Sequence, residues 1–304
     1  MTLLQRRDNN NRITDMKLAR FRTGDREGIG IVQDNEILDC SDAGEGLGTI
    51  PDILQAGEEG RRRLQAAAGG RSYALEEVAL LAPVPKPGKF LCVGLNYLDH
   101  IEETGAKLPE RPKIFNKQST CVNDPGAPVH IPRISDKVDY EGELGMVIGR
   151  RCRHVTKDQA AEVIGGYLIV DDVTVRDWQV HSSTWTMGKS FDTHGPTGPW
   201  LVTADEIGDP HRLDLKTWVN GELRQDTNTR NLLFNCYVLV EYLSTAFTLE
   251  PGDIISTGTS SGVGFMMDPP VFLKAGDVVR IEIEDIGVLE NPFIAEPEDT
   301  IFIE

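Results

Sequence analysis

The sequence predicts an α+β protein dominated by strands, with a small β-rich N-terminal domain and a larger second domain. Most apolar stretches in the 304 residues are short and are separated by turn-forming residues, which is typical of strands. Pro83, Pro85 and Pro87 lie within five positions of one another. Such a segment cannot form a helix or a central strand. We therefore predict a small domain over residues 16–82 and a larger one over residues 83–304.

The N-terminal part begins with a polar stretch, MTLLQRRDNNNRIT, that lacks the apolar core of a secretory signal. We predict a disordered tail over residues 1–15. The runs MKLARF, GIGIV and EILDC follow, separated by polar turns, and they predict a small antiparallel meander. The stretch from Thr49 to about Ala68 predicts one helix, with Thr49 as its N-cap and Pro51 in its first turn.

The larger part alternates strands with a few helices. The runs FLCVGL, DYEGELGMVIG, GYLIVDDVTVRD, DIISTG and VVRIEIED predict strands. Residues 236–246 predict a helix. A short helix is also predicted in VTKDQAAEVIGG, where Thr156 and Gln159 form a capping box and Gly165 and Gly166 end the helix.

Composition excludes several classes of function. Asp and Glu number 48 against 31 Lys and Arg, a net charge of −17. Nucleic acids and anionic membranes both require a basic surface, so neither is an expected partner. No apolar stretch approaches the roughly 20 residues that span a bilayer. The five cysteines are odd in number and form no CxxC pair, which favours a reducing, cytoplasmic location.

Acidic residues gather at the ends of two predicted strands. Glu141 and Glu143 are two apart on a strand, so both carboxylates leave the same face. Asp171 and Asp172 follow the second strand, and alternation places one on each face without choosing between them. Buried parallel carboxylates repel one another unless a cation lies between them. Oxygen ligands of this kind suit Mg²⁺ or Mn²⁺, with Ca²⁺ as a further option. The alternative is a set of solvent-facing charges at strand ends.

The segment NYLDHIEE holds a histidine and a carboxylate one helical turn apart. If this segment is helical, His100 and Glu103 share a face, as a general-base pair requires. A preceding Gly-Leu-Asn-Tyr turn would let it close as a lid. The alternative is a surface contact.

Further candidates lie in three later segments. Lys189 lies in a GKS triplet, but a phosphate-binding loop would need glycine where Ser183 stands. Near a metal, Lys189 could instead bind a carboxylate or a developing oxyanion, and the alternative is an ordinary solvated lysine. Arg176 and Gln179 are three apart and form a possible anion-and-amide pair, or a structural salt bridge. The glycines of STGTSSGVGF expose backbone N–H groups suited to a carboxylate or enolate oxygen, although most such loops are simple turns.

Together, seven segments resemble the fumarylacetoacetate hydrolase family. They run in order from about residue 89 to residue 291, roughly two thirds of the chain, and are KFLCVGLNYLDHIEE, DYEGELGMVIG, GYLIVDDVTVRDWQ, GKSFDTHGPTGPWLVT, VNGELRQ, LVEYLSTAFTLEPGDIISTGTSSGVG and IGVLEN. The resemblance implies a catalytic domain built as a mixed β-roll or distorted barrel, a small N-terminal domain before it, and a homodimer.

The resemblance also implies roles for individual residues. It implies that Glu141, Glu143 and Asp172, rather than Asp171, are the metal ligands. It implies that His100 and Glu103 lie on a lid and activate water. The residues implied to stabilise the substrate or the developing oxyanion are Lys189 and Thr259, and those implied to line the same pocket are Arg176 and Gln179.

The chain departs from the family pattern at three positions. Ser260 stands where a proline usually follows the second threonine of TGT, Asp171 stands where asparagine often precedes the metal aspartate, and His194 replaces a frequent aromatic residue. None of these changes removes a metal ligand or the histidine–glutamate pair. They leave the identity of the substrate open.

The resemblance predicts a metal-dependent enzyme that hydrolyses a carbon–carbon bond in a 1,3-dicarbonyl acid of the acylpyruvate, or 2,4-dioxo acid, type. His100 would activate water, and Lys189 with Thr259 would stabilise the oxyanion. The nearest alternative is a decarboxylase, or an isomerase or hydratase, of 2-oxo acids that uses the same site. A more distant alternative is a non-catalytic scaffold that binds a divalent ion.

Overall fold

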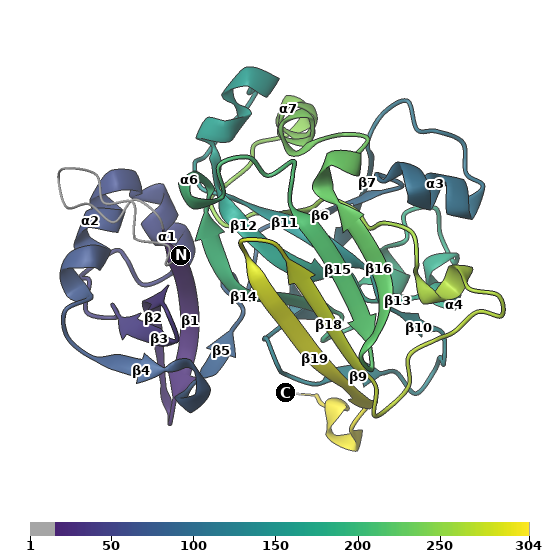
Figure 1. Ribbon diagram of the computed structural model, residues 1–304, viewed down its shortest axis with the longest axis horizontal. Coiled ribbons are helices and arrows are strands. Elements are labelled where there is room, and N and C mark those ends of the chain that lie inside the picture. Colours follow the sequence, from purple (N-terminus) through teal and green to yellow (C-terminus); the bar gives the residue numbers. More distant parts are fainter. Residues whose placement is uncertain (1–15, 304) are drawn as a thin grey trace, which may run out of the picture.

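The computed structural model describes residues 16–303, so the predicted tail of residues 1–15 lies outside the described residues. Strands dominate the fold and helices are few and short, as the sequence predicts (Figure 1). The predicted N-terminal meander is present as β1 (Lys17–Thr23), β2 (Arg26–Gln33) and β3 (Glu36–Asp39). Two short strands that were not predicted, β4 (Ser72–Ala74) and β5 (Ala79–Leu81), pair with β3 and β1.

One large sheet runs through both parts of the chain. Its main order is β4-β3-β2-β1-β14-β12-β11-β17-β6-β7, so the meander joins the rest of the molecule through the antiparallel pairing of β1 with β14. The predicted division at residue 83 falls between β5 and β6. The later strands of this sheet are β6 (Phe90–Gly94), β7 (Lys113–Lys117), β8 (Val122–Asn123), β11 (Gly142–Ile148), β12 (Ile164–Asp171), β14 (Gly195–Thr203) and β17 (Ile254–Ser256).

A second sheet packs against the large one and encloses the main core. Its order is β16-β15-β18-β19-β9, and a separate ribbon pairs β10 with β13. The core includes Met146 and Ile169 from the large sheet and Leu215, Ile281 and Phe293 from the second sheet, all buried. The strands concerned are β9 (Val129–Ile131), β10 (Val138–Asp139), β13 (Thr174–Val175), β15 (Asp214–Val219), β16 (Glu222–Asn228), β18 (Val278–Ile283) and β19 (Gly287–Ala295).

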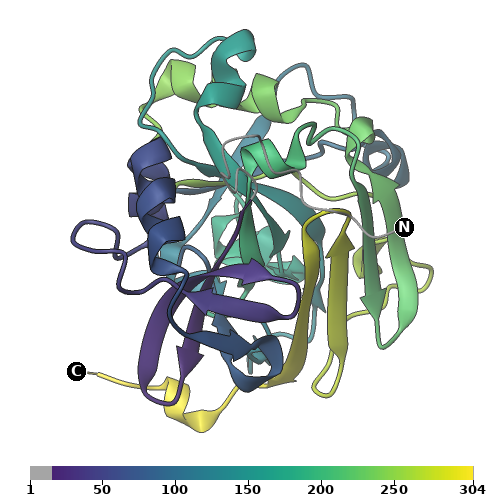
Figure 2. The ribbon, with the colours of Figure 1, turned by 60° about the vertical axis from the view of Figure 1, so that its left-hand side comes forward.

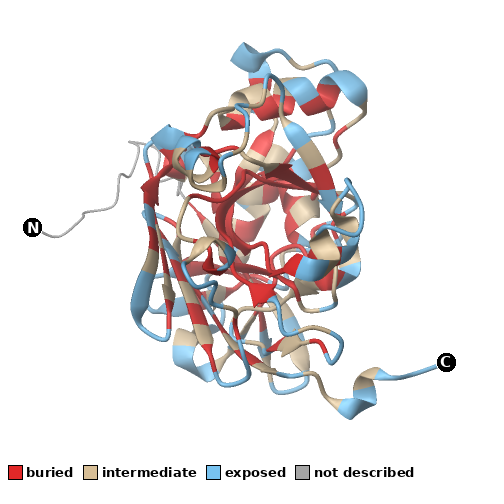
Figure 3. Cartoon of the chain, turned by 90° about the vertical axis from the view of Figure 1, so that its right-hand side faces the viewer, coloured by how far each residue is buried: buried red, intermediate tan, exposed pale blue. Residues whose placement is uncertain are grey.

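The sheets curve around this core without closing. Buried strands occupy the centre of the molecule, and exposed residues lie mainly on the surrounding loops and helices (Figure 3). Over residues 16–303 the path of the large sheet ends at β4 on one side and β7 on the other, with no pairing between them. The fold is therefore an open roll rather than a closed barrel.

The helices agree in part with the sequence prediction. The helix expected from Thr49 to Ala68 is two helices, because Gly57, with a φ of 59°, begins the second one. Thr49 does cap the first through a capping box with Asp52, and both helices pack beside the N-terminal strands (Figure 2). The helices are α1 (Ile50–Gln55), α2 (Gly57–Ala67), α3 (Leu98–Thr104), α4 (Arg176–Gln179), α5 (Thr186–Lys189), α6 (Ala204–Ile207) and α7 (Cys236–Ala246).

A second correction concerns the segment that follows Thr156. Its predicted capping box with Gln159 is present, but the turn it caps is a short 3₁₀ helix, η3 (Lys157–Glu162). The predicted stop at Gly165 and Gly166 is wrong, since both glycines lie inside β12. A Cβ on Gly166 would lie 2.3 Å from the carbonyl oxygen of Val202, so close strand packing explains this glycine better than a helix end does.

Candidate active site

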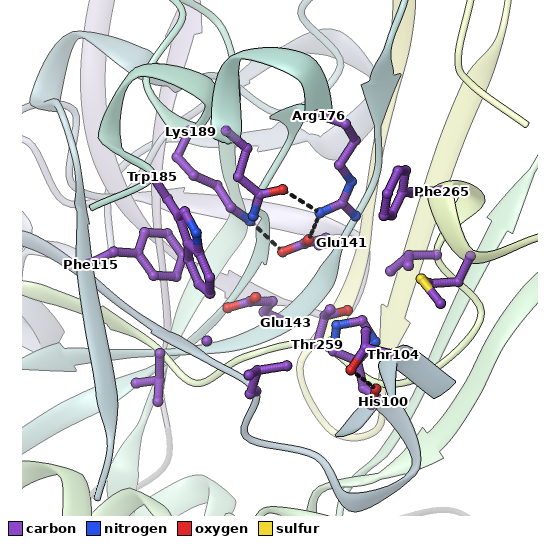
Figure 4. Close-up of a pocket in the computed structure, with 16 residues that line it drawn as sticks. His100, Thr104, Phe115, Glu141, Glu143, Arg176, Trp185, Lys189, Thr259 and Phe265 are labelled. Carbon is purple, nitrogen blue, oxygen red and sulfur yellow. Dashed lines mark hydrogen bonds and ion pairs between the residues drawn. The ribbon is translucent and has the colours of Figure 1, made fainter. Parts of the chain in front are cut away.

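Three buried carboxylates meet where β11 and β12 pair. Glu141 directly precedes β11, Glu143 lies within it, and Asp172 directly follows β12. The antiparallel register places Gly142 opposite Asp171, which brings both strand ends to one point. The ligand oxygens of Glu141, Glu143 and Asp172 all lie within 4.8 Å of one another. Figure 4 shows Glu141 and Glu143 on the same wall of a cavity.

This donor set fits a hard divalent cation. Burial and the neighbouring charges of Asp172 and Glu141 raise the pKa of Glu143 well above its ordinary value. The Ser256 hydroxyl and the Gly258 amide, the latter at 2.9 Å, both donate to Oε2 of Glu143. The charge of Lys189 and the Ser256 hydrogen bond lower its pKa only in part. Carboxylate oxygens crowded in this way suit Mg²⁺, Mn²⁺ or Ca²⁺, since a cation removes their repulsion.

Two buried lysines lie against the same carboxylates. Lys189 Nζ lies 2.6 Å from Oε2 of Glu141 and 2.7 Å from Oδ2 of Asp172. Lys117 Nζ lies 2.7 Å from Oδ1 of Asp172. Burial lowers the pKa of Lys117, but the charge of Asp172 more than offsets this and the pKa is raised. Sequence reasoning missed Lys117. The pattern that could have revealed Lys117 is the alternation of side chains along β7, which places it on the same face as the buried Phe115.

Arg176 is held on the opposite side of the carboxylates. Its Nε donates to Asp139 at 2.8 Å, and its Nη1 lies 2.7 Å from Glu141 and 3.2 Å from the amide oxygen of Gln179. The predicted Arg176–Gln179 pair therefore exists. Asp139, which orients the guanidinium, was missed although it continues the every-second-residue series of Glu143 and Glu141.

The segment predicted as a lid forms helix α3 beside the cavity. His100 Nδ1 lies 3.0 Å from Oε2 of Glu103, so an ionised Glu103 requires the ring to donate from Nδ1. The basic nitrogen is then Nε2. The other oxygen of Glu103 accepts from the amide of Gly262 at 2.9 Å, and the Ser261 hydroxyl donates to Asp99 at 3.0 Å. These two contacts tie α3 to the loop that follows β17.

That loop differs in one respect from the expectation. Its backbone amides do bind carboxylates, but these belong to the protein itself. The amide of Gly258 donates to Glu143, that of Gly262 to Glu103 and that of Gly264 to Asp139. Each lies 2.9 Å from its acceptor oxygen. The loop therefore orients a predicted metal ligand, the partner of His100 and the anchor of Arg176.

Thr259 lies in the same loop and faces the cavity, although its hydroxyl already has partners. Thr259 Oγ1 donates to the carbonyl of Gly142 at 3.1 Å and accepts from Gln225 Nε2 at 2.8 Å. To donate to a substrate oxygen, Thr259 would have to exchange its bond to Gly142. Its predicted role stays a prediction.

A single cavity of about 150 Å³ connects most of these groups. Glu103 and Asp172 lie behind its surface. Figure 4 shows the cavity with His100, the carboxylates, Lys189 and Arg176 around it. The predicted site residues that line it are His100, Glu141, Glu143, Arg176, Gln179, Lys189 and Thr259, and sequence reasoning missed Thr104, Phe115, Trp185 and Phe265.

Comparison with known proteins identifies the family. The family model described as "Fumarylacetoacetate (FAA) hydrolase C-terminal" matches residues 89–294. The chain belongs to the fumarylacetoacetate hydrolase family.

Relatives in this family are named for different reactions. Oxaloacetate tautomerase fahd2, mitochondrial, from Xenopus laevis is 38% identical, over 97% of this chain and 95% of its own. Fumarylacetoacetate hydrolase from psychrophilic Exiguobacterium antarcticum is 36% identical, with a TM-score of 0.82 over 92% of this chain and 100% of its own. Maleylpyruvate hydrolase from Sphingobium sp. SYK-6, in complex with manganese(II) and pyruvate, is 32% identical, with a TM-score of 0.78 over 93% and 100%. This is a family of enzymes.

The three departures from the family pattern lie in different surroundings. Asp171 accepts a hydrogen bond from the amide of Glu141 at 3.1 Å and is buried directly behind the carboxylates. The carbonyl of Ser260 accepts from Gln225 at 3.1 Å. His194 is buried outside the cavity, and its Nε2 donates to the carbonyl of His130 at 2.7 Å. Only Asp171 touches a predicted metal ligand directly.

Asp171→Asn is expected to flatten the pH dependence of stability. Burial, with the charges of Asp172 and Glu141, raises the pKa of Asp171 to about 8, so the folded protein holds a proton that the unfolded chain releases near pH 3.9. This contribution to stability is complete below about pH 3.9 and is lost as the pH rises towards about 8. Urea unfolding of metal-free protein should show the wild type losing about 1.4 kcal/mol per pH unit relative to the variant.

The control for this experiment is Asp226→Asn, at an exposed aspartate on β16. Its unfolding free energy should run parallel to that of the wild type across the same pH range. Parallel curves for Asp171→Asn and the wild type would show that Asp171 is ionised in the folded protein, contrary to this expectation.

Proposed function

We propose that this chain is a divalent-metal-dependent hydrolase that cleaves a carbon–carbon bond in an acylpyruvate-type 2,4-dioxo acid. The observation that carries the proposal is the His100–Glu103 pair, 3.0 Å apart, whose imidazole faces the cavity lined by Glu141 and Glu143. Hydrolysis needs an activated water next to a bound oxo acid. A histidine oriented by a carboxylate supplies the base for that step.

The residues take distinct roles in this proposal. A divalent ion on Glu141, Glu143 and Asp172 would supply a Lewis acid for the 2-oxo acid end of the substrate. Glu103 accepts a hydrogen bond from the Nδ1–H of His100, which leaves Nε2 unprotonated and able to take a proton from water. The resulting hydroxide attacks C4, the distal carbonyl carbon, the C3–C4 bond then breaks, and the imidazolium returns the proton to C3. The products are a carboxylic acid and a 2-oxo acid.

Lys189 is the proposed donor to the oxyanion that develops on the distal carbonyl. Its ammonium lines the cavity and is positioned by Glu141 and Asp172. Donors fixed in advance in a buried site stabilise such a charge more strongly than water does. Arg176 and Gln179 would contact the acid end, since both line the cavity on the side of Glu141.

A second candidate is a tautomerase or isomerase of small 2-oxo acids. His100 could equally move a proton between carbon and oxygen, and a cavity of about 150 Å³ suits a small acid. The 38%-identical relative is named an oxaloacetate tautomerase, which supports this candidate. Decarboxylation of an oxo acid would use the same residues. The three reactions differ in their products: hydrolysis yields two acids, decarboxylation yields carbon dioxide, and tautomerisation conserves mass.

Metal removal is expected to abolish turnover. We expect EDTA to stop product formation from a panel of acylpyruvates, oxaloacetate and unsaturated 2-oxo acids, and Mn²⁺ or Mg²⁺ to restore it, with products identified by mass. Two acids from an acylpyruvate would support the hydrolase, and isomers alone would support the second candidate. A protein that EDTA destabilises but that turns over no member of the panel would be a non-catalytic metal-binding scaffold.

We also propose that the chain forms a homodimer, as the family resemblance implies. Sedimentation equilibrium would test this, and a mass of one chain at micromolar concentration would contradict it.

Among residues 16–303, no helix has both the length and the apolar character needed to cross a membrane.

A further inference from the structure

The cavity has a polar end and an apolar end. Arg176 and Gln179 lie at one end, where Nη2 of Arg176 lies 2.7 Å from Oδ2 of Asp139 and Nη1 lies 2.7 Å from Glu141. The other end is formed by Val93, Phe115 and Trp185. Figure 4 shows Trp185 and Phe115 on the side of the cavity opposite Arg176 and Phe265. A charged oxo acid end is favoured beside the guanidinium, which directs the remaining carbon chain towards Trp185.

Contacts on several sides fix the Trp185 indole in place. Its six-membered ring lies directly on Gly94, where an added Cβ would come within 2.4 Å of Cζ3 of the tryptophan. Phe115 meets it edge-to-face, with ring centroids 5.5 Å apart. The ammonium of Lys113 lies 3.6 Å from the centroid of the ring. These contacts hold the ring against the cavity.

The backbone of Trp185 also has an uncommon conformation. Its φ is 62° and its ψ is −10°, a left-handed region that costs a bulky residue about 1–3 kcal/mol. Its carbonyl accepts the amides of Gly188 and Lys189 at 3.0 and 3.2 Å, so the same turn that places the indole also starts the helix carrying Lys189. Strain of this kind persists where the surrounding contacts enforce it, and here those contacts form a wall of the cavity.

We infer that Trp185 is a specificity-determining residue that limits the length of the apolar chain a substrate carries beyond its 2-oxo acid end. The inference rests on the proposed function, because it takes the acid end to bind beside the metal ligands and Arg176. The substrate class it names is a 2-oxo acid with a short distal chain. The opposite wall, from Val263 to Met266, bears the partly exposed Phe265 and is less confined.

The test is a binding series on the Mn²⁺-loaded protein, which needs no turnover. Affinities for pyruvate, 2-oxobutanoate, 2-oxopentanoate and 2-oxohexanoate are measured by calorimetry. In Trp185→Ala, affinity should rise about fourfold with each added methylene, as buried apolar groups do. In the wild type the rise should stop or reverse within the series, and pyruvate should bind both proteins within about threefold, since it does not reach the indole.

Two variants complete the design. Trp185→Phe keeps an aromatic ring of smaller size and should shift the length limit by less than alanine does, which covers the case in which the alanine variant does not fold. Trp218→Ala is the matched control, because Trp218 lies on β15 beneath Arg280 and does not line the cavity. Its length profile should equal that of the wild type.

The outcomes separate this inference from the proposed function. If the wild type binds none of the acids with Mn²⁺, the proposed function fails and the inference fails with it. If pyruvate binds and the Trp185 variants keep the wild-type length profile, only the assignment of Trp185 is overturned. A limit that moves in the Trp185 variants and not in Trp218→Ala supports it.

Discussion

Replacing His100 by alanine is expected to lower kcat for acylpyruvate hydrolysis by about 10²–10⁴-fold, the usual contribution of a positioned general base. The imidazole lines the cavity and is aligned by Glu103 at 3.0 Å, so its loss leaves water without a proton acceptor. Mn²⁺ affinity should change little, because the predicted ligands lie on β11 and after β12, whereas His100 lies on α3. Steady-state kinetics and calorimetry would measure the two effects separately.

The matched control is His154→Ala, at an exposed histidine that does not line the cavity. It should retain wild-type kcat. Glu103→Gln should lie between the two, since the amide keeps a contact with His100 but no longer fixes the proton on Nδ1. If His100→Ala hydrolysed every substrate at the wild-type rate, water activation by this residue would be wrong. If it lost hydrolysis but kept keto–enol exchange, the two candidate reactions would use different bases.

Glu143→Gln is expected to have opposite effects on stability and on function. The amide keeps the shape of the side chain and an oxygen for the Gly258 amide, but it removes a carboxyl group whose ionised form is disfavoured by burial and by Asp172 and Glu141. Without metal at neutral pH, the free energy of unfolding should rise by at least about 1 kcal/mol, because folding raises the pKa of Glu143 well above its ordinary value and one pKa unit corresponds to about 1.4 kcal/mol. With metal, the affinity for Mn²⁺ should fall by at least about 100-fold, because even outer-shell partners cost 10–100-fold. Turnover should be lost.

Urea unfolding with and without Mn²⁺ measures both effects in one experiment. The wild type should gain stability from Mn²⁺, whereas Glu143→Gln should start higher and gain little. The control is Glu282→Gln, because the side chain of Glu282 is 49% exposed on β18. A variant less stable than the wild type without metal would show that the lysines already compensate the charge of Glu143.

Local sequence patterns predicted the groups that lie close together along the chain. Glu141 and Glu143 share a face because strand side chains alternate, and His100 and Glu103 meet because helical residues three apart are neighbours. The preference for Asp172 over Asp171 came only from the family resemblance. The register of β11 with β12 determines which of the two faces the glutamates, and no local pattern contains that register.

Contacts between distant segments could not be predicted in this way. Lys117 lies 55 positions before Asp172, and the two meet although β11, β17 and β6 lie between β12 and β7 in the large sheet, which curves around the core. No local pattern places the Trp185 ring, because its position in the cavity depends on the distant Gly94, which makes room for the ring. The single helix predicted from Thr49 to about Ala68 was wrong for a local reason. The positive φ at Gly57 interrupts it, so that two helices form.

The hydrogen bonds of the loop after β17 should make the ionisation of the site visible by NMR. Gly258, Gly262 and Gly264 each donate an amide to a different carboxylate, on Glu143, Glu103 and Asp139. The chemical shift of an amide proton responds to the charge of its acceptor. A single ¹⁵N–¹H spectrum recorded during titration with acid or Mn²⁺ would therefore resolve the ionisation of these three groups individually. Three neighbouring glycines would act as built-in probes of the site, with no label attached to a functional side chain.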